Sequence, residues 1–514
     1  MKGLDQRFAR NSAWSGASVV VNLLIGLLLQ PYIIRKLGDQ RYGVWALAFS
    51  LLEYLWFADL GFMPAVAILC ARYKALGDDE RINQVLNTAT LYFGSVGAVV
   101  WALAIFLHSK VSPFFQIPAE DRDAFSKVIL LSTLTWGAAA ILQIYLAALD
   151  GFQRFDLSGR VLALMVAARS LSYVLVLHVG GGLVAMACVY ALCQVGGYVA
   201  YYWCFRQCFP GFRLSRGSIR LSALKEMANY GIHSFVASIA GLLLNQSAPV
   251  LIGHFLAPRY VGYYALPVRL MQYAVDGVSR IGMVTRSKVA EMGCGERRTV
   301  IAGLAVLVNR YCLTLFMPVA IFFLCCGHCL IQKWVGQSFA DNVGPLLPWL
   351  VTSYVLALGG QFNSGSVLFG LGRHARYARS IFMEGILGGV GMYFTIPRYG
   401  ILAAAAITST LMLVSRGFYT PHLVCRDLGY SLAAYLRGIY IRPLLAAVPT
   451  VALTRLALAC GATPVSWIGL AVFAILITAS YFSTAFFVCP TREHRDLLLS
   501  LISQNPAFKW SGPG

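Results

Sequence analysis

The sequence predicts an all-α, polytopic membrane protein with about fourteen transmembrane helices, and three observations lead to that prediction. Only 12% of the 514 residues are charged and 58% are hydrophobic, whereas a soluble domain carries about 25% charged residues. Apolar runs long enough to cross hydrocarbon recur from residue 12 to residue 489. Positive charge collects in every second loop between these runs. So few polar residues could not cover the outside of a water-soluble fold.

The expected spans are given to within about three residues at each end. They cover residues 12–34, 42–69, 84–107, 127–149, 161–177, 183–204, 228–255, 260–284, 300–326, 345–370, 380–396, 401–421, 443–459 and 467–489. The first span is long and has no Ala-x-Ala exit, so no cleavable signal is expected. We therefore expect an N-lobe of six spans at 1–204, a linker at 205–227, a C-lobe of six spans at 228–421, two further helices at 422–489 and a tail at 490–514.

The lysines and arginines of the loops predict the orientation of the chain. With a cytoplasmic N-terminus, the inside segments carry 26 of the 41 basic residues, the outside segments nine, and the spans six. Cytoplasmic loops are enriched in Lys and Arg, so both termini are expected in the cytoplasm. The net charge of +20 then reflects this bias and contact with anionic membrane lipid. Nucleic-acid binding is not expected, because the basic residues are scattered over short loops.

The thirteen cysteines are spread along the chain in odd number, which argues against a disulfide framework. The one cluster, Cys325, Cys326, His328 and Cys329, lies at the outer end of the ninth span. A metal site is conceivable there, but small apolar residues at a helix end are the more common reading. No metal and no cofactor is expected.

The second half of the chain restarts in the same orientation as the first. A shift of 219 residues places Leu37 on Leu256, Gly43–Leu47 on Gly262–Leu266 and Tyr54 on Tyr273. Such parallel halves are related by an axis along the membrane normal in several transporter classes, although short apolar strings also match by chance. The linker between the halves contains an amphipathic stretch at 219–225, which is either a surface-lying elbow helix or an ordinary basic loop.

The eighth span carries the most informative charges. Arg269, Gln272, Asp276 and Arg280 are spaced three, four and four residues apart. At about 100° per residue they share one stripe about 80° wide. Lipid cannot face such a stripe, so it lines either a helix seam or a water-filled cavity. An ion pair between Asp276 and Arg280 would account for two of the four residues and leave the stripe net positive.

Other charged residues also fall inside spans, where each costs about 2.5–3.5 kcal/mol at the centre. They are Glu53 and Asp59 in the second span, Arg169 in the fifth, Arg310 in the ninth and Glu384 in the eleventh. The two arginines either pair with these acids inside the bundle or line an aqueous path suited to phosphate, whose oxygens match the guanidinium fork. A desolvated acid in a membrane is a reasonable H⁺ or Na⁺ site. No Gly-x-x-x-x-Gly-Lys-Ser/Thr loop is present, so any active transport is expected to use an ion gradient.

Three strings carry a resemblance to a known family. LGDQRYGVWAL at 37–47, FADLGF at 57–62 and RYKA at 72–75 resemble the opening of the polysaccharide transporter family, the Wzx-type O-antigen flippases. The wider multidrug/oligosaccharidyl-lipid/polysaccharide (MOP) superfamily is built from two six-helix lobes, and its flippase branches add two helices. The first span departs from lipid II flippases, because Asn22 and Gln30 are its only polar interior residues and it has no arginine.

The resemblance implies a carrier that moves an undecaprenyl-pyrophosphate-linked oligosaccharide across the bacterial inner membrane by ion-coupled alternating access. It further implies a polysaccharide polymerase complex as a partner. An arginine-lined cavity would hold the pyrophosphate, with Arg269, Arg280, Arg310, Arg169 and Gln272 as the substrate residues. The resemblance also implies ion coupling, with Asp276, Glu53, Asp59 and Glu384 as the coupling residues.

Two other functions compete with this reading. A multidrug or cation antiporter of the same superfamily is expected to have an acidic, aromatic cavity and about twelve spans. The net positive interior of this chain disfavours that function. A membrane glycosyltransferase or polymerase usually needs a substantial outside loop or domain for its catalytic residues. The longest outside loop, at 108–126, is short, and its acids Glu120, Asp121 and Asp123 resemble the start of a helix. The protein is therefore not expected to be an enzyme.

Overall fold

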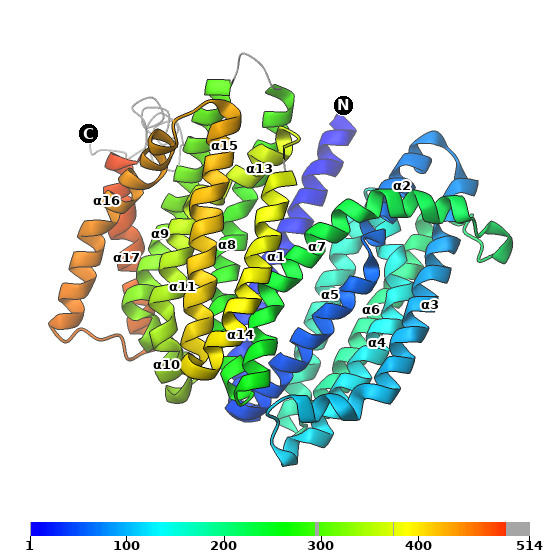
Figure 1. Cartoon of the computed structure of the whole chain (residues 1–514), viewed down its shortest axis with the longest axis horizontal. Coiled ribbons are helices and arrows are strands. Elements are labelled where there is room, and N and C mark those ends of the chain that lie inside the picture. The colour runs from blue at the N-terminus through cyan, green and yellow to red at the C-terminus, as the bar shows by residue number, and fades with distance from the viewer. Residues whose placement is uncertain (1, 293–297, 374, 490–514) are drawn as a thin grey trace, which may run out of the picture. The chain divides into compact units, whose positions relative to one another are not determined.

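A computed structural model describes residues 2–292, 298–373 and 375–489 (Figure 1). The elements within these ranges are helices, and no strand occurs among them. Nine of the described helices are long and apolar enough to cross a membrane, and a bent pair at residues 25–76 adds a tenth. The prediction of an all-α membrane fold is confirmed.

The helices follow the predicted spans in chain order. Their bounds are α1 Lys2–Glu53, η1 Tyr54–Asp59, α2 Phe62–Leu76, α3 Asp79–Val111, η2 Ser112–Phe114, α4 Ala119–Gly151, α5 Phe155–His178, α6 Leu183–Cys208, η3 Arg216–Ser218, α7 Leu221–Phe255, α8 Arg259–Met292, α9 Arg298–Trp334, α10 Gln337–Val343, η4 Gly344–Leu346, α11 Leu347–Ser353, η5 Tyr354–Leu358, α12 Gly359–Gln361, α13 Ser364–Gly370, α14 Ala375–Met412, η6 Leu413–Tyr419, α15 Thr420–Leu428, α16 Leu432–Ala459 and α17 Trp467–Val488.

Two of the long helices each hold two predicted spans that meet at a glycine. Gly38 in α1 has φ 77° and ψ 164°, and Gly400 in α14 has φ 62° and ψ −149°. Positive φ is open to glycine and costly for residues with a β-carbon, so the chain turns between crossings at these positions. With these turns counted, and with α10–α13 taken as one interrupted segment, the described helices form fourteen segments that follow the fourteen predicted spans in order.

The second crossing is broken in the middle, although the sequence predicts one span at 42–69. The α-helix ends at Glu53, continues as a 3₁₀ turn to Asp59, and resumes at Phe62 after left-handed Leu60 (φ 49°) and Gly61 (φ 73°). The two parts are bent by 47°. The Asp59 carboxylate accepts the Met63 N–H at 3.0 Å, so it caps the first turn of α2.

The two copies of the repeat meet where the sequence matches. A β-carbon built on Gly43 would overlap the carbonyl of Pro258, and one on Gly262 would lie 3.7 Å from the Gly43 α-carbon. The Tyr263 hydroxyl donates to the Asp39 carboxylate at 2.7 Å. A two-fold relation brings matching residues of two copies together at its axis. The contact of Gly43 with Gly262, its match at 219 residues, therefore supports the repeat.

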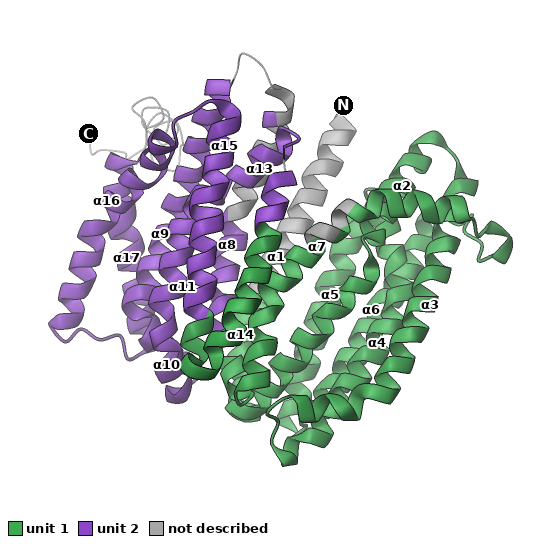
Figure 2. Cartoon of the chain, viewed as in Figure 1, with its two compact units in different colours: residues 1–265, 381–404 green, residues 266–380, 405–514 purple. Residues whose placement is uncertain are grey.

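The described chain divides into two compact units, coloured in Figure 2. Unit 1 contains residues 1–265 and 381–404, and unit 2 contains residues 266–380 and 405–514. Packing therefore groups α7 and part of α14 with the first six spans. Two close approaches hold them there: Gly253 of α7 lies against Leu47 of α1, and Gly385 of α14 lies against Leu243 of α7.

The linker stretch at 219–225 is not a separate helix, because Leu221 to Lys225 form the first turns of α7. Figure 1 shows these turns running across the ends of α2 and α3 before α7 descends. Two side-chain contacts fix them. Glu226 accepts hydrogen bonds from the Tyr73 hydroxyl at 2.9 and 2.7 Å and lies 3.5 Å from the Arg72 guanidinium.

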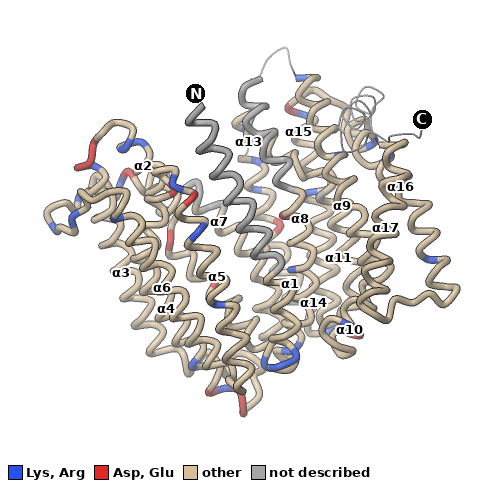
Figure 3. The backbone as a smooth tube through the Cα atoms, turned by 180° about the vertical axis from the view of Figure 1, so that it is seen from behind, with Lys and Arg blue, Asp and Glu red and all other residues tan. Residues whose placement is uncertain are grey.

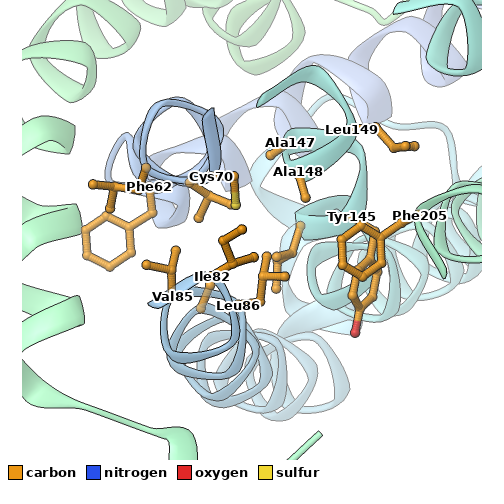
Figure 4. Packing of buried hydrophobic residues seen from close by; sticks show 14 of the residues in the cluster. Phe62, Cys70, Ile82, Val85, Leu86, Tyr145, Ala147, Ala148, Leu149 and Phe205 are labelled. Carbon is orange, nitrogen blue, oxygen red and sulfur yellow. The ribbon is translucent and has the colours of Figure 1, made fainter. Parts of the chain in front are cut away.

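The hydrophobic core of unit 1 gathers at the same end of the bundle. Side chains of α2, α3, α4 and α6 interlock there (Figure 4). Phe62, Leu86, Tyr145 and Phe205 are buried, and the Tyr145 and Phe205 ring centroids lie 5.1 Å apart. This packing fixes α4 and α6 side by side, and these two helices carry most of the cavity described below.

Candidate functional site

The polar face predicted on α8 is present and exposed. Arg269, Gln272 and Asp276 are exposed, whereas Leu270 and Met271 on the opposite side are buried. The Gln272 amide donates to the Asp276 carboxylate at 2.7 Å, so the two side chains lie along one line of the helix. The side chain of Arg280, one turn further on, lies outside the described part of the chain.

Arg310 of α9 is in a different setting. Its side chain is 8% exposed and donates to two backbone carbonyls, Gly438 of α16 at 2.6 Å and Cys489 at 3.4 Å. Cys489 directly follows α17, and its carbonyl also accepts from the Arg442 guanidinium at 3.4 Å. Arg310 thus joins three helices of unit 2.

The remaining predicted charges lie in unit 1. Glu384 is 5% exposed on α14, next to Gly385, which packs on α7. Asp59 is 8% exposed and caps α2. Charged residues otherwise gather mainly near helix ends, with a few along the helices (Figure 3). Glu53, the last residue of α1, and Arg169 both act electrostatically on the hydroxyl of Tyr190 in α6.

Glu53 lies at a cavity that the sequence analysis did not predict. The cavity encloses about 490 Å³ of empty space, part of it open to the surroundings. One face each of α1 with η1, of α4 and of α6 lines the cavity. The lining residues are Phe49, Leu52, Glu53 and Trp56 from α1 and η1, Ser132, Trp136, Ala139 and Gln143 from α4, and Tyr190, Gln194 and Tyr198 from α6.

The cavity wall combines aromatic rings with neutral polar groups. Phe49 and Tyr190 meet edge to face with ring centroids 4.9 Å apart. Gln194 and Tyr198 are hydrogen-bonded to each other. Ser132 and Gln143 are 1% and 6% exposed, yet the Ser132 hydroxyl and the Gln143 side-chain nitrogen have no hydrogen-bond partner among the described residues. The signal was in the sequence: residues 132, 136, 139 and 143 follow helical spacing, as does the stripe on α8.

The cysteine cluster at the end of α9 gives no grouped ligands. No group of three or more His, Cys, Asp or Glu side chains arranged to hold a metal ion is found within the described residues. His328 lies 3.5 Å from the carboxylate of Asp341, a contact that is an ion pair only when the imidazole is protonated.

A family model described as polysaccharide biosynthesis protein matches residues 8–285. The chain therefore belongs to that family of membrane proteins. No curated protein matches the sequence.

Several solved structures share the fold. The inward closed form of the lipid II flippase MurJ is 9% identical with a TM-score of 0.72, covering 95% of this chain and 99% of that one. An inward-facing multidrug resistance MATE transporter of the MOP superfamily is 14% identical with a TM-score of 0.62, covering 80% and 96%. The bent form of the Vibrio cholerae MATE transporter VcmN is 13% identical with a TM-score of 0.55, covering 85% and 100%. At these identities the likeness concerns the fold, which is that of MOP-superfamily transporters.

Proposed function

We propose that this protein is a flippase that moves an undecaprenyl-pyrophosphate-linked oligosaccharide from the inner to the outer leaflet of the bacterial inner membrane. It works by alternating access of its two lobes, coupled to H⁺ or Na⁺. The family match and the fold shared with a lipid II flippase support the class of function. The exposed polar face of α8 supports a pyrophosphate-linked lipid as the substrate.

The exposed charges of α8 limit what its polar face can contact, because a charge that faces lipid costs free energy. A charged side chain facing lipid at the centre of a span costs about 2.5–3.5 kcal/mol. Arg269 and Asp276 are both exposed within α8, so their face is stable only against water or a polar ligand. Arg269 presents a planar fork of N–H donors that matches two phosphate oxygens. A pyrophosphate is the anion of the proposed lipid that fits this fork.

Asp276 supplies a coupling mechanism on the same face. Ionised, it competes with the substrate for the guanidinium groups of α8 and holds the Gln272 amide. Protonated, it releases these donors for phosphate. A cation that binds one state better than the other shifts the balance between states by its difference in affinity. We therefore assign ion coupling first to Asp276, and then to Glu53, which lines the cavity of unit 1.

One observation favours the alternative of a multidrug or cation antiporter. The cavity of unit 1 has an acid and several aromatic walls, the surroundings that an organic cation prefers. Arg169 weakens this reading, because it acts on the same Tyr190 as Glu53 does. A membrane glycosyltransferase or polymerase is the less favoured third reading, and no group of the described site is arranged for catalysis.

Depletion of the protein tests the substrate. We expect an undecaprenyl-pyrophosphate-linked oligosaccharide to accumulate on the inner leaflet, measured by extraction and by access to an external glycosidase before and after permeabilisation. Accumulation on the outer leaflet would indicate a polymerase. Normal lipid intermediates with altered resistance to organic cations would indicate the antiporter.

Substitution of Arg269 tests whether this side chain binds the substrate. Arg269→Ala should lower flipping at least 100-fold in proteoliposomes with the extracted lipid, and Arg269→Lys should be impaired because a point charge lacks the fork. The control is Arg298→Ala, which removes an exposed arginine at the start of α9. Full activity of Arg269→Ala at matched protein level would remove Arg269 from the substrate path.

Ion coupling is tested with the same vesicles. An imposed pH or Na⁺ gradient should change the rate or extent of flipping by the wild type, and Asp276→Asn should remove that dependence. If neither gradient has an effect on either protein, the protein is a facilitator that follows substrate concentration.

The orientation is tested by cysteine labelling in a variant whose exposed native Cys188 and Cys460 are replaced by serine. Cysteines introduced at the exposed positions Asp123 and Asp341 should react from outside. Those at Asp79 and Arg376 should react only after permeabilisation. The reverse pattern would overturn the assignment of both termini to the cytoplasm.

A further inference from the structure

We propose that the cavity between α1, α4 and α6 is a binding site for a short stretch of sugar rings of the transported glycan, separate from the pyrophosphate face on α8. The inference rests on the proposed function and adds a glycan subsite to it. The cavity is partly open to the surroundings, so a glycan chain that enters it can extend beyond it. Its lining holds the two kinds of group that a sugar ring needs.

The first kind is an unsatisfied hydrogen-bonding group. Buried polar groups in folded proteins are almost always hydrogen-bonded, and an exception calls for an explanation. Two exceptions lie on one face of α4, eleven residues apart in sequence. The Ser132 hydroxyl and the Gln143 side-chain nitrogen are both buried, both line the cavity, and both lack a partner among the described residues. A ligand that accepts hydrogen bonds would satisfy both.

The second kind is an aromatic surface. Trp136 stands on the α4 face between Ser132 and Gln143, and Trp56 and Tyr190 come from the facing helices. Such rings combine a large apolar surface with a polar edge. A sugar ring matches this pattern, because its C–H groups form apolar faces while its hydroxyls project from the rim. Water alone would leave the aromatic walls poorly covered.

The polar groups also distinguish a sugar from a cation. The Gln143 nitrogen is a donor and needs an acceptor, and neither Na⁺ nor a hydrocarbon-substituted cation such as tetraphenylphosphonium offers one. Sugar hydroxyls, ring oxygens and acetamido carbonyls do. The same hydroxyls donate to acceptors on the other walls, such as the carboxylate of Glu53 and the amide oxygen of Gln194. Ser132 and Gln143 lie eleven residues apart in α4, about 16 Å along the helix axis, so a short stretch of polyhydroxylated rings serves these groups where a single ring could not reach both.

The test separates the sugar from the rest of the lipid. Purified protein in nanodiscs is titrated with two probes, undecaprenyl pyrophosphate and the lipid-linked oligosaccharide extracted from depleted cells. Trp56 and Trp136 at the cavity provide the fluorescence signal, and calorimetry gives an independent affinity. The wild type should bind the glycosylated lipid more tightly than the bare one.

Three variants carry the comparison. Gln143→Leu should weaken binding of the glycosylated lipid at least tenfold and leave binding of undecaprenyl pyrophosphate unchanged. Ser132→Ala, which removes a single atom, should act in the same direction and guards against misfolding of the leucine variant. The control is Thr135→Val on the same helix, whose hydroxyl already donates to the Leu131 carbonyl at 2.6 Å. It should change neither affinity.

Each outcome bears on a different part of the proposal. If the wild type binds the glycosylated lipid and neither Gln143→Leu nor Ser132→Ala weakens it, the sugar site is wrong and the flippase stands. If the variants instead lose binding of tetraphenylphosphonium, titrated separately as a cationic probe, the cavity takes cations. If the wild type binds neither lipid, the proposed function and the sugar site both fall.

Discussion

Two arginines that look alike in the sequence lie in opposite settings. Arg269 and Arg310 each interrupt an apolar span, and both were predicted as substrate residues. The structure leaves Arg269 exposed on α8 and surrounds Arg310 with backbone carbonyls of α16 and α17. The difference teaches that depth in a span does not decide the role of a charge. The supply of local acceptors does, and a helix end such as that of α17 provides them.

The two acids of the second crossing repeat this contrast. Asp59 caps α2 and is buried, whereas Glu53, one turn and a half earlier, lies exposed at the cavity. Arg310 and Asp59 are thus bound to the backbone of the fold, whereas Arg269 and Glu53 are exposed. The three experiments below test this division.

The largest effect on stability is expected at Arg310. Arg310→Ala removes two charge-assisted hydrogen bonds that join α9 to α16 and to the end of α17, so it should lower the free energy of unfolding by about 3 kcal/mol. Arg269→Ala should leave stability unchanged. Thermal unfolding of both variants in the same detergent measures the difference. Equal melting temperatures would show that Arg310 is not a structural residue and would return it to the substrate path.

The sequence predicted the helical crossings well because hydropathy and loop charge are local properties. It also predicted the α8 face, since helical spacing places Arg269, Gln272 and Asp276 together. It could not assign Arg310, whose carbonyl acceptors lie 128 and 179 residues further along the chain. Gly61 and Pro64 indicated a break after Asp59 in the sequence. The hydrogen bond from the Met63 N–H to the Asp59 carboxylate is visible only in the folded chain.

The cavity of unit 1 was missed for a different reason. Neutral polar residues inside a span give a weaker signal than charged ones, although Ser132 and Gln143 are spaced on one face of α4. Their lack of partners depends on what α1 and α6 place opposite them. That is a property of packing, and no spacing rule predicts it.

A smaller effect is expected at the cap of α2. Asp59→Ala removes the acceptor of the Met63 N–H and should cost about 1 kcal/mol, typical of a lost helix cap. Asp59→Asn keeps an acceptor oxygen and should retain most of the stability and the transport rate. Glu53→Gln should leave the melting temperature unchanged. Loss of ion-dependent flipping in Asp59→Asn, with normal stability, would show that Asp59 is a coupling acid as well as a cap.

The smallest effect on stability is expected at Gln272. Its amide holds the Asp276 carboxylate one turn away on an exposed helix face, and such pairs contribute about 0.2–0.5 kcal/mol. Gln272→Ala should therefore unfold within error of the wild type. Its flipping rate should still fall several-fold, because the Asp276 carboxylate then turns more readily toward Arg269 and competes with phosphate. The double variant Gln272→Ala, Asp276→Asn removes that competitor and should regain the rate of Asp276→Asn alone. If Gln272→Ala lowers the rate equally in both backgrounds, the amide contacts the substrate directly, and the open face of α8 binds phosphate through Gln272 as well as Arg269.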